Sequence, residues 1–62
     1  MKRIVLLKHL KENGCILKRE GSNHSWYVNT QNGNLSSVPR HTGINEITAI
    51  KICKQLGIPV KK

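Results

Sequence analysis

His24 is the residue whose type and position most favour chemistry in this chain of 62 residues. It follows the turn-forming residues Gly21, Ser22 and Asn23, and it begins a segment rich in β-formers, HSWYVN, at residues 24–29. A neutral imidazole accepts a proton near pH 7. Beside positive charge it could remove the proton of a ribose 2′-hydroxyl, the nucleophile built into RNA, while the cations stabilise the attacked phosphate.

Positive charge dominates the composition. Eleven lysine and arginine residues stand against three glutamates, for a net charge of +8 with histidine neutral. Such a surface attracts polyanions, so nucleic acid is the first partner to expect, an acidic protein the second and a membrane surface the third. No apolar run could span a bilayer and no signal peptide is recognisable, so we expect a cytoplasmic protein without a membrane partner. With only three scattered acids, we expect no metal and no cofactor.

Three cations flank the candidate base and a later segment, VPRH. Lys18 and Arg19 precede the turn, and Arg40 precedes His41. We expect Lys18, Arg19 and Arg40 to contact phosphates, although a purely solvated role fits their positions as well. Taken alone, one histidine after a turn is a weak motif, because most such histidines are structural or solvated.

Two amphipathic segments predict helices near the ends of the chain. Three leucines form an apolar stripe over residues 3–13. A second stripe recurs at i, i+3, i+4 and i+7, and consists of Ala49, Ile52, Cys53 and Leu56. Asn45 or Thr48 is the expected N-cap of this second helix, and Gly57 is its expected stop.

Three short segments between these helices predict strands, at residues 15–20, 24–29 and 35–39. Asn32-Gly33 separates the last two and is a strong hairpin signal, because both residues tolerate positive φ. Pro39 ends the third strand, since proline donates no hydrogen bond to a ladder.

The order helix, three strands, helix predicts an α+β fold with one antiparallel sheet. Both helices must bury their stripes against one face of the sheet, which leaves the opposite face open to a polyanion. Alternation places His24 and Trp26 on the same face but does not identify that face. It slightly favours Trp26 in the core; in the other interpretation, Trp26 lies on the open face beside His24 and stacks on a base. We expect residues 1–62 to form a single domain with a frayed tail at 59–62.

Cys15 and Cys53 lie far apart in the sequence and lack metal-ligand spacing. We interpret both as reduced core residues. A disulfide or half of a zinc site is the weaker alternative, because no CxxC motif or histidine pair stands nearby.

Several short motifs resemble the HicA family of mRNA interferase toxins. They are GSNH at Gly21–His24, VPRH at Val38–His41 and KQLGI at Lys54–Ile58, in the order and at the spacing of that family. The segment LLKHLKENGCILKRE also resembles the family's opening helix and first strand. The resemblance covers nearly the whole chain, and the set in register is more specific than any one motif.

The resemblance implies a fold like the double-stranded-RNA-binding domain and a toxin that cleaves mRNA. It also implies a HicB-type antitoxin that covers the active face. The catalytic histidine of the family's Gly-Ser-x-His element maps onto His24, and Gly21 and Ser22 form the turn that positions it. We expect Ser22 and Trp26 to contact RNA as well. His41 is expected to contact RNA or to have a structural role, and a role as general acid is the alternative.

This chain departs from the family pattern in two places. Asn23 stands where many members carry a second histidine. The loop after His41 is shorter than is common and lacks a Lys-Pro-Gly type of lead-in, which affects loop contacts rather than the fold. Two other functions stay open: a non-catalytic RNA-binding module, and an interaction domain whose basic surface serves an acidic partner.

Overall fold

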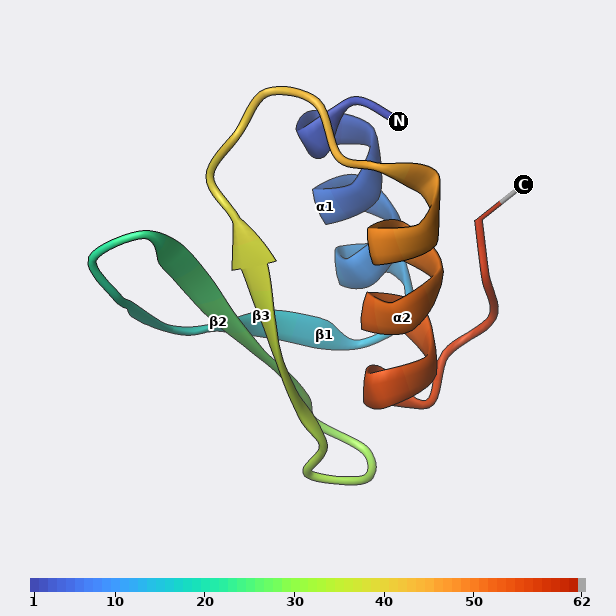
Figure 1. Cartoon of the computed structure of the whole chain (residues 1–62). Coiled ribbons are helices and arrows are strands. Elements are labelled where there is room, and N and C mark those ends of the chain that lie inside the picture. Colours follow the sequence, from blue (N-terminus) through green and yellow to red (C-terminus); the bar gives the residue numbers. More distant parts are fainter. Residues whose placement is uncertain (62) are drawn as a thin grey trace.

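The computed structural model describes residues 1–61 and shows the predicted element order (Figure 1). Two helices enclose three strands in the sequence: α1 (Arg3–Glu12), β1 (Cys15–Glu20), β2 (His24–Asn29), β3 (Leu35–Pro39) and α2 (Glu46–Leu56). The strand bounds are those predicted, and α1 ends one residue before the expected position.

The strands form one antiparallel sheet in the order β1-β2-β3. The ladder between β1 and β2 contains an irregularity: Leu17 lies opposite Tyr27 and Arg19 lies opposite Trp26, so Lys18 is an extra residue between them. Directly paired residues of an antiparallel sheet point to the same face. The bulge therefore turns Arg19 to the face of Trp26, where uninterrupted alternation would have sent it to the other side.

Both helices pack on the same face of the sheet, as predicted, and the other face is uncovered (Figure 1). Residues from α1, α2, the helix-facing side of the sheet and the segments on either side of α2 form the core. Its buried members are Leu6, Leu10, Cys15, Val38, Ile44, Ala49, Ile52, Cys53, Leu56 and Ile58. Cys15 and Cys53 are free and buried, in agreement with the prediction.

The slight preference for Trp26 in the core is wrong. Ser25 and Asn29 are the β2 residues that are fully buried, and Tyr27 packs against the core between them. Alternation then places His24, Trp26 and Val28 on the open face. The buried polar side chains have hydrogen-bond partners: Asn29 Nδ2, for example, donates to the carbonyl of Leu56 at 2.8 Å, at the end of α2.

The predicted boundaries of α2 are confirmed. The side chain of Asn45 accepts a hydrogen bond from the backbone N–H of Ile47 at 2.8 Å, and Gly57 adopts the left-handed conformation at φ 72°. These contacts satisfy backbone groups that the helix ends leave without a partner.

The hairpin at Asn32-Gly33 is also confirmed, but its turn differs from the two-residue form. Gly33 has a φ of 78°, whereas no non-glycine residue within 1–61 has a positive φ. The loop is longer than two residues, and the hydrogen bond that closes it runs from the backbone N–H of Asn29 to the carbonyl of Asn34 at 2.9 Å.

The start of the C-terminal tail contacts α1. Nε2 of His9 lies 2.6 Å from the carbonyl oxygen of Pro59. Fraying of residues 59–62 stays a prediction, and its last position, Lys62, lies outside the described residues.

Candidate active site

His24 begins β2, opposite Pro39 of β3, and its side chain is exposed. It lines an open hollow of about 250 Å³ together with Ser22, Asn23, Pro39, Arg40 and His41. The fold thus brings the two motifs, which lie 17 residues apart at their histidines, to one place on the surface. Two imidazoles border the same small volume, large enough to admit a phosphate group.

Gly21 has a local reason to be glycine. Its N–H donates to the carbonyl of His24 at 2.8 Å, which closes the turn between β1 and β2. A Cβ added at Gly21 would stand 3.1 Å from that carbonyl oxygen and 3.5 Å from Nε1 of Trp26. The close approach of these groups holds the start of β2, and with it His24, against the turn.

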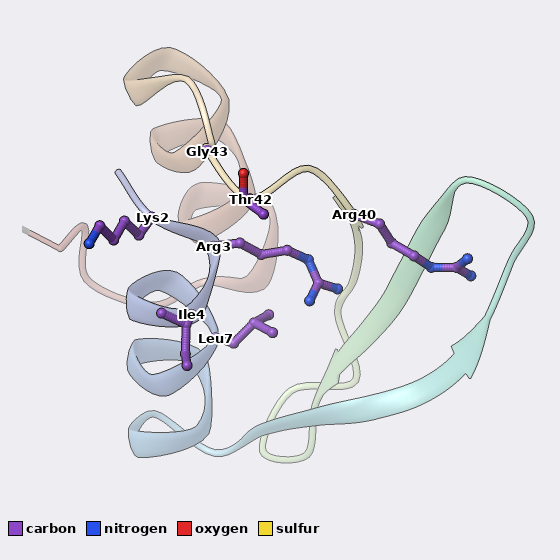
Figure 2. Close-up of a pocket in the computed structure, with 7 residues that line it drawn as sticks. All are labelled: Lys2, Arg3, Ile4, Leu7, Arg40, Thr42 and Gly43. Carbon is purple, nitrogen blue, oxygen red and sulfur yellow. The ribbon is translucent and has the colours of Figure 1, made fainter.

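Arg40 binds the backbone of this turn. Its guanidinium donates to the carbonyl of Gly21, to that of Ser22 at 3.2 Å and to that of His24 at 3.5 Å. It also forms an ion pair of 3.2 Å with Glu20. Figure 2 shows the side chain extended toward the turn. Arg40 therefore positions His24, and its expected contact with a phosphate stays a prediction.

A second set of hydrogen bonds supports the turn from the helix-facing side of the sheet. Nη2 of Arg3 donates to Oγ of Ser25 at 2.9 Å, and Nε of Arg3 donates to the carbonyl of Pro39 at 2.8 Å. Oγ of Ser25 in turn donates to the carboxylate of Glu20 at 2.6 Å. The side chain of Arg3 leaves α1 in the direction of the sheet (Figure 2). We call Arg3, Ser25, Glu20 and Arg40 the turn network.

The hydrogen bond from Ser25 lowers the pKa of the Glu20 carboxyl below its ordinary value, helped by the hydrogen bond and charge of Arg40 and, less, by the charge of Arg3. Glu20 therefore remains an acceptor over a wide pH range. Sequence reasoning missed Arg3, Ser25 and Glu20. A signal existed only for Glu20, which is one of three acids in the chain and directly precedes the turn.

Of the remaining predicted contacts, Arg19 and Trp26 lie on the open face. The guanidinium carbon of Arg19 lies over the ring of Trp26, 5.6 Å from its centroid. Trp26 is half-buried and lies two residues beyond His24 on the same face. Lys18, at the bulge, and Ser22, in the turn, are exposed. An aromatic ring, a stacked cation and an imidazole thus share one face, which suits a nucleotide better than a compact apolar ligand.

Neither helix within residues 1–61 combines the length and apolar character that crossing a bilayer requires. Nowhere in that part of the chain do three His, Cys, Asp or Glu side chains gather in a way that would hold a metal ion.

The comparisons with known proteins point to one family. A family model described as the HicA toxin of bacterial toxin–antitoxin systems matches residues 6–58, from the first turn of α1 to just beyond α2. No significant match was found among curated proteins or among solved structures. The matched segment includes the hollow, the turn and most of the sequence that builds them. The chain belongs to the HicA family, the toxins of bacterial toxin–antitoxin systems.

Proposed function

We propose that this toxin is a metal-independent endoribonuclease that cleaves mRNA with His24 as the general base. The observation that carries the proposal is the exposed imidazole of His24 in a hollow that it shares with His41, on the uncovered face of a protein with a net charge of +8. Membership in a toxin family and attraction between the basic surface and RNA support the same conclusion.

The reaction balances without a metal ion. His24 takes the proton of a ribose 2′-hydroxyl, O2′ attacks the adjacent phosphorus and the bond from phosphorus to O5′ breaks. O5′ then needs a proton, and we assign its delivery to His41 because both imidazoles line the same hollow. The products are a 2′,3′-cyclic phosphate and a 5′-hydroxyl end.

The other side chains bind the substrate. Trp26 stacks on a base beside the cleaved bond, and Arg19 carries positive charge to the same place. Lys18 and the hydroxyl of Ser22 are exposed and contact the RNA backbone. Arg40 contributes charge to the hollow while its hydrogen bonds hold the turn.

We further propose that a HicB-type antitoxin inhibits the toxin in the cytoplasm by covering the open face. A toxin of a toxin–antitoxin system has an antitoxin partner, and complementary charge would speed its association with a surface this basic. Coverage of the open face would hide His24 and Trp26 from RNA at the same time.

The decisive experiment incubates the purified protein with mRNA in EDTA and analyses the fragment ends. We expect shortened products with cyclic phosphate ends, and we expect His24→Ala to lose cleavage while its circular dichroism is unchanged. His9→Ala is the matched control, because His9 lies on α1 and does not line the hollow. A stable gel shift without shortened RNA in the parent protein would favour the non-catalytic RNA-binding module. Equal cleavage by His24→Ala would exclude this residue as the base.

A further inference from the structure

A groove runs beside α1, on the helix side of the molecule, and Arg40 is the lining residue that it shares with the hollow of His24. It consists of two adjoining hollows of about 630 and 460 Å³, which share Ile4 and Leu7. Figure 2 shows the first, between the start of α1 and the segment that follows β3. The second continues between α1 and β1, where Leu17 and Tyr27 line it. We call this surface the α1 groove.

The floor of the α1 groove is apolar and unusually exposed. The side chains of Ile4 and Leu17 are 74% and 46% exposed, although each is a branched aliphatic residue in a small protein. Ile16, which is 54% exposed, borders the groove at the edge strand, where its pairing with Val28 turns its side chain toward the open face. Exposed apolar patches that adjoin one another and have a polar rim mark interaction surfaces. The rim here is basic, because Lys2, Lys8 and Lys11 border the same hollows.

Two possible occupants fit this surface poorly. RNA could place its phosphates on the lysines of the rim, but it has no aliphatic side chains to cover the floor at Ile4 and Leu7. A second copy of the chain would bring another net charge of +8 against a rim of lysines. Repulsion between like charges opposes that association.

An acidic protein segment fits both parts of the surface. Its apolar side chains would cover the floor, and its carboxylates would meet the lysines of the rim. We propose that the antitoxin anchors in the α1 groove through aliphatic or aromatic side chains flanked by acidic residues. This inference rests on the antitoxin partnership of the proposed function and adds to it a second contact surface, distinct from the open face.

The two surfaces meet at the edge of the sheet. Ile16 of β1 lines the groove and pairs in register with Val28, which lies on the open face. Arg40 lines the other end of the groove and holds the turn that carries His24. One partner can therefore reach around β1 and contact the groove and the catalytic face together.

The test compares two matched substitutions, Ile4→Glu and Ile47→Glu. Ile4 and Ile47 each occupy the second position of a helix and are 74% and 65% exposed, but only Ile4 lines the groove. A glutamate near a helix N-terminus is favourable, so both variants should fold. The probe is the protein encoded by the reading frame beside the toxin gene. Its affinity is measured by calorimetry, and RNA cleavage is measured with and without it.

We expect Ile4→Glu to cleave RNA at the parental rate and to bind the antitoxin about thirtyfold or more weakly, as when a central interface anchor is removed. Ile47→Glu should match the parent in both assays. The double variant Lys8→Glu/Lys11→Glu should slow association and reduce its dependence on salt.

Three results would overturn the inference while leaving the nuclease proposal intact. Equal antitoxin affinity of Ile4→Glu and the parent would show that the groove is not the anchor. Loss of RNA cleavage in folded Ile4→Glu would make the groove an RNA surface. A parental dimer that Ile4→Glu dissociates in sedimentation would make it a self-association surface. Absence of RNA cleavage in the parent would count against the nuclease alone, since calorimetry needs no catalysis.

Discussion

The hydroxyl of Ser25, which is fully buried, donates a hydrogen bond of 2.6 Å to the exposed carboxylate of Glu20. The bond links the interior to the turn that carries His24, because Glu20 also pairs with Arg40 at 3.2 Å. A carboxylate that accepts hydrogen bonds is stabilised in its charged form. The position of His24, the proposed general base, therefore depends on a side chain that takes no part in the proposed chemistry.

The first prediction concerns acid stability. Because the pKa of Glu20 is lowered in the folded protein, its contribution to stability is fully present above the ordinary pKa of a glutamate. That contribution is lost as the pH falls through the lower folded value. The urea midpoint of the parent should thus fall on acidification across this window, and that of Glu20→Gln should fall less.

Glu12→Gln is the control for this prediction, since Glu12 is exposed on α1. It should keep the parental pH dependence of the urea midpoint. RNA cleavage at neutral pH gives a second measurement: Glu20→Gln should lower kcat with the fold intact, because the turn is less firmly held. A variant with parental kcat and parental acid sensitivity would show that the network does not support the turn.

A second prediction concerns Trp26. Trp26→Ala should weaken binding of single-stranded RNA by about 1–3 kcal/mol, the usual range for stacking of one base on an aromatic ring. Trp26→Phe should keep most of the affinity because it retains an aromatic face. Tyr27→Phe is the control on the opposite, helix-facing side of β2. Fluorescence anisotropy with labelled RNA measures all three, and full affinity in Trp26→Ala would remove Trp26 from the binding surface.

The role of His41 can be measured with two substrates. If His41 protonates the leaving oxygen, His41→Ala should slow RNA cleavage by about a hundredfold or more. It should scarcely affect a uridine 3′-(p-nitrophenyl phosphate), whose leaving group needs no proton. His24→Ala should lose activity on both substrates. An equal loss on both in His41→Ala would indicate a phosphate contact in place of a general acid.

A fourth prediction concerns the end of α2. Gly57→Ala should lower the free energy of unfolding by about 1–2 kcal/mol through its left-handed backbone. It should lose about 1 kcal/mol more because the new Cβ would stand 2.8 Å from Nδ2 of Asn32, which donates to the carbonyl of Leu56.

Gly33→Ala separates these two effects. Gly33 has a φ of 78°, but a Cβ there meets no atom within 4 Å. Its variant should therefore show only the backbone cost in urea denaturation. Equal losses at Gly33 and Gly57 would show that Asn32 moves aside without cost.

The sequence predicted the elements well because their signals are local. Asn45, Gly57 and Asn32-Gly33 act through bonds to residues a few positions away, so their effects are visible in short stretches. The family resemblance singled out the two motifs, but it did not predict that they meet in space. The hollow shared by His24 and His41 is therefore a finding of the structure.

The face of Trp26 and the turn network could not be predicted, for two physical reasons. The inward positions of β2 hold polar residues, Ser25 and Asn29, which form hydrogen bonds with the distant residues Arg3 and Leu56. Hydrophobic alternation therefore favoured the wrong face. Arg19 reaches the open face only through the bulge at Lys18, and no residue type in CILKRE identifies a bulge. Contacts such as Arg3 to Pro39 span 36 positions and have no sequence signature.

The interior location of Ser25 has a genetic consequence. Bacteria selected for survival while they produce this toxin should accumulate lesions at Ser25 and Arg3 as well as at His24. Ser25 and Arg3 would affect catalysis only indirectly, through hydrogen bonds to the turn and to the strand ends beside it. Such survivors would hold a soluble, antitoxin-binding protein with a misplaced imidazole, an inactive form that still titrates the antitoxin away from intact copies of the toxin.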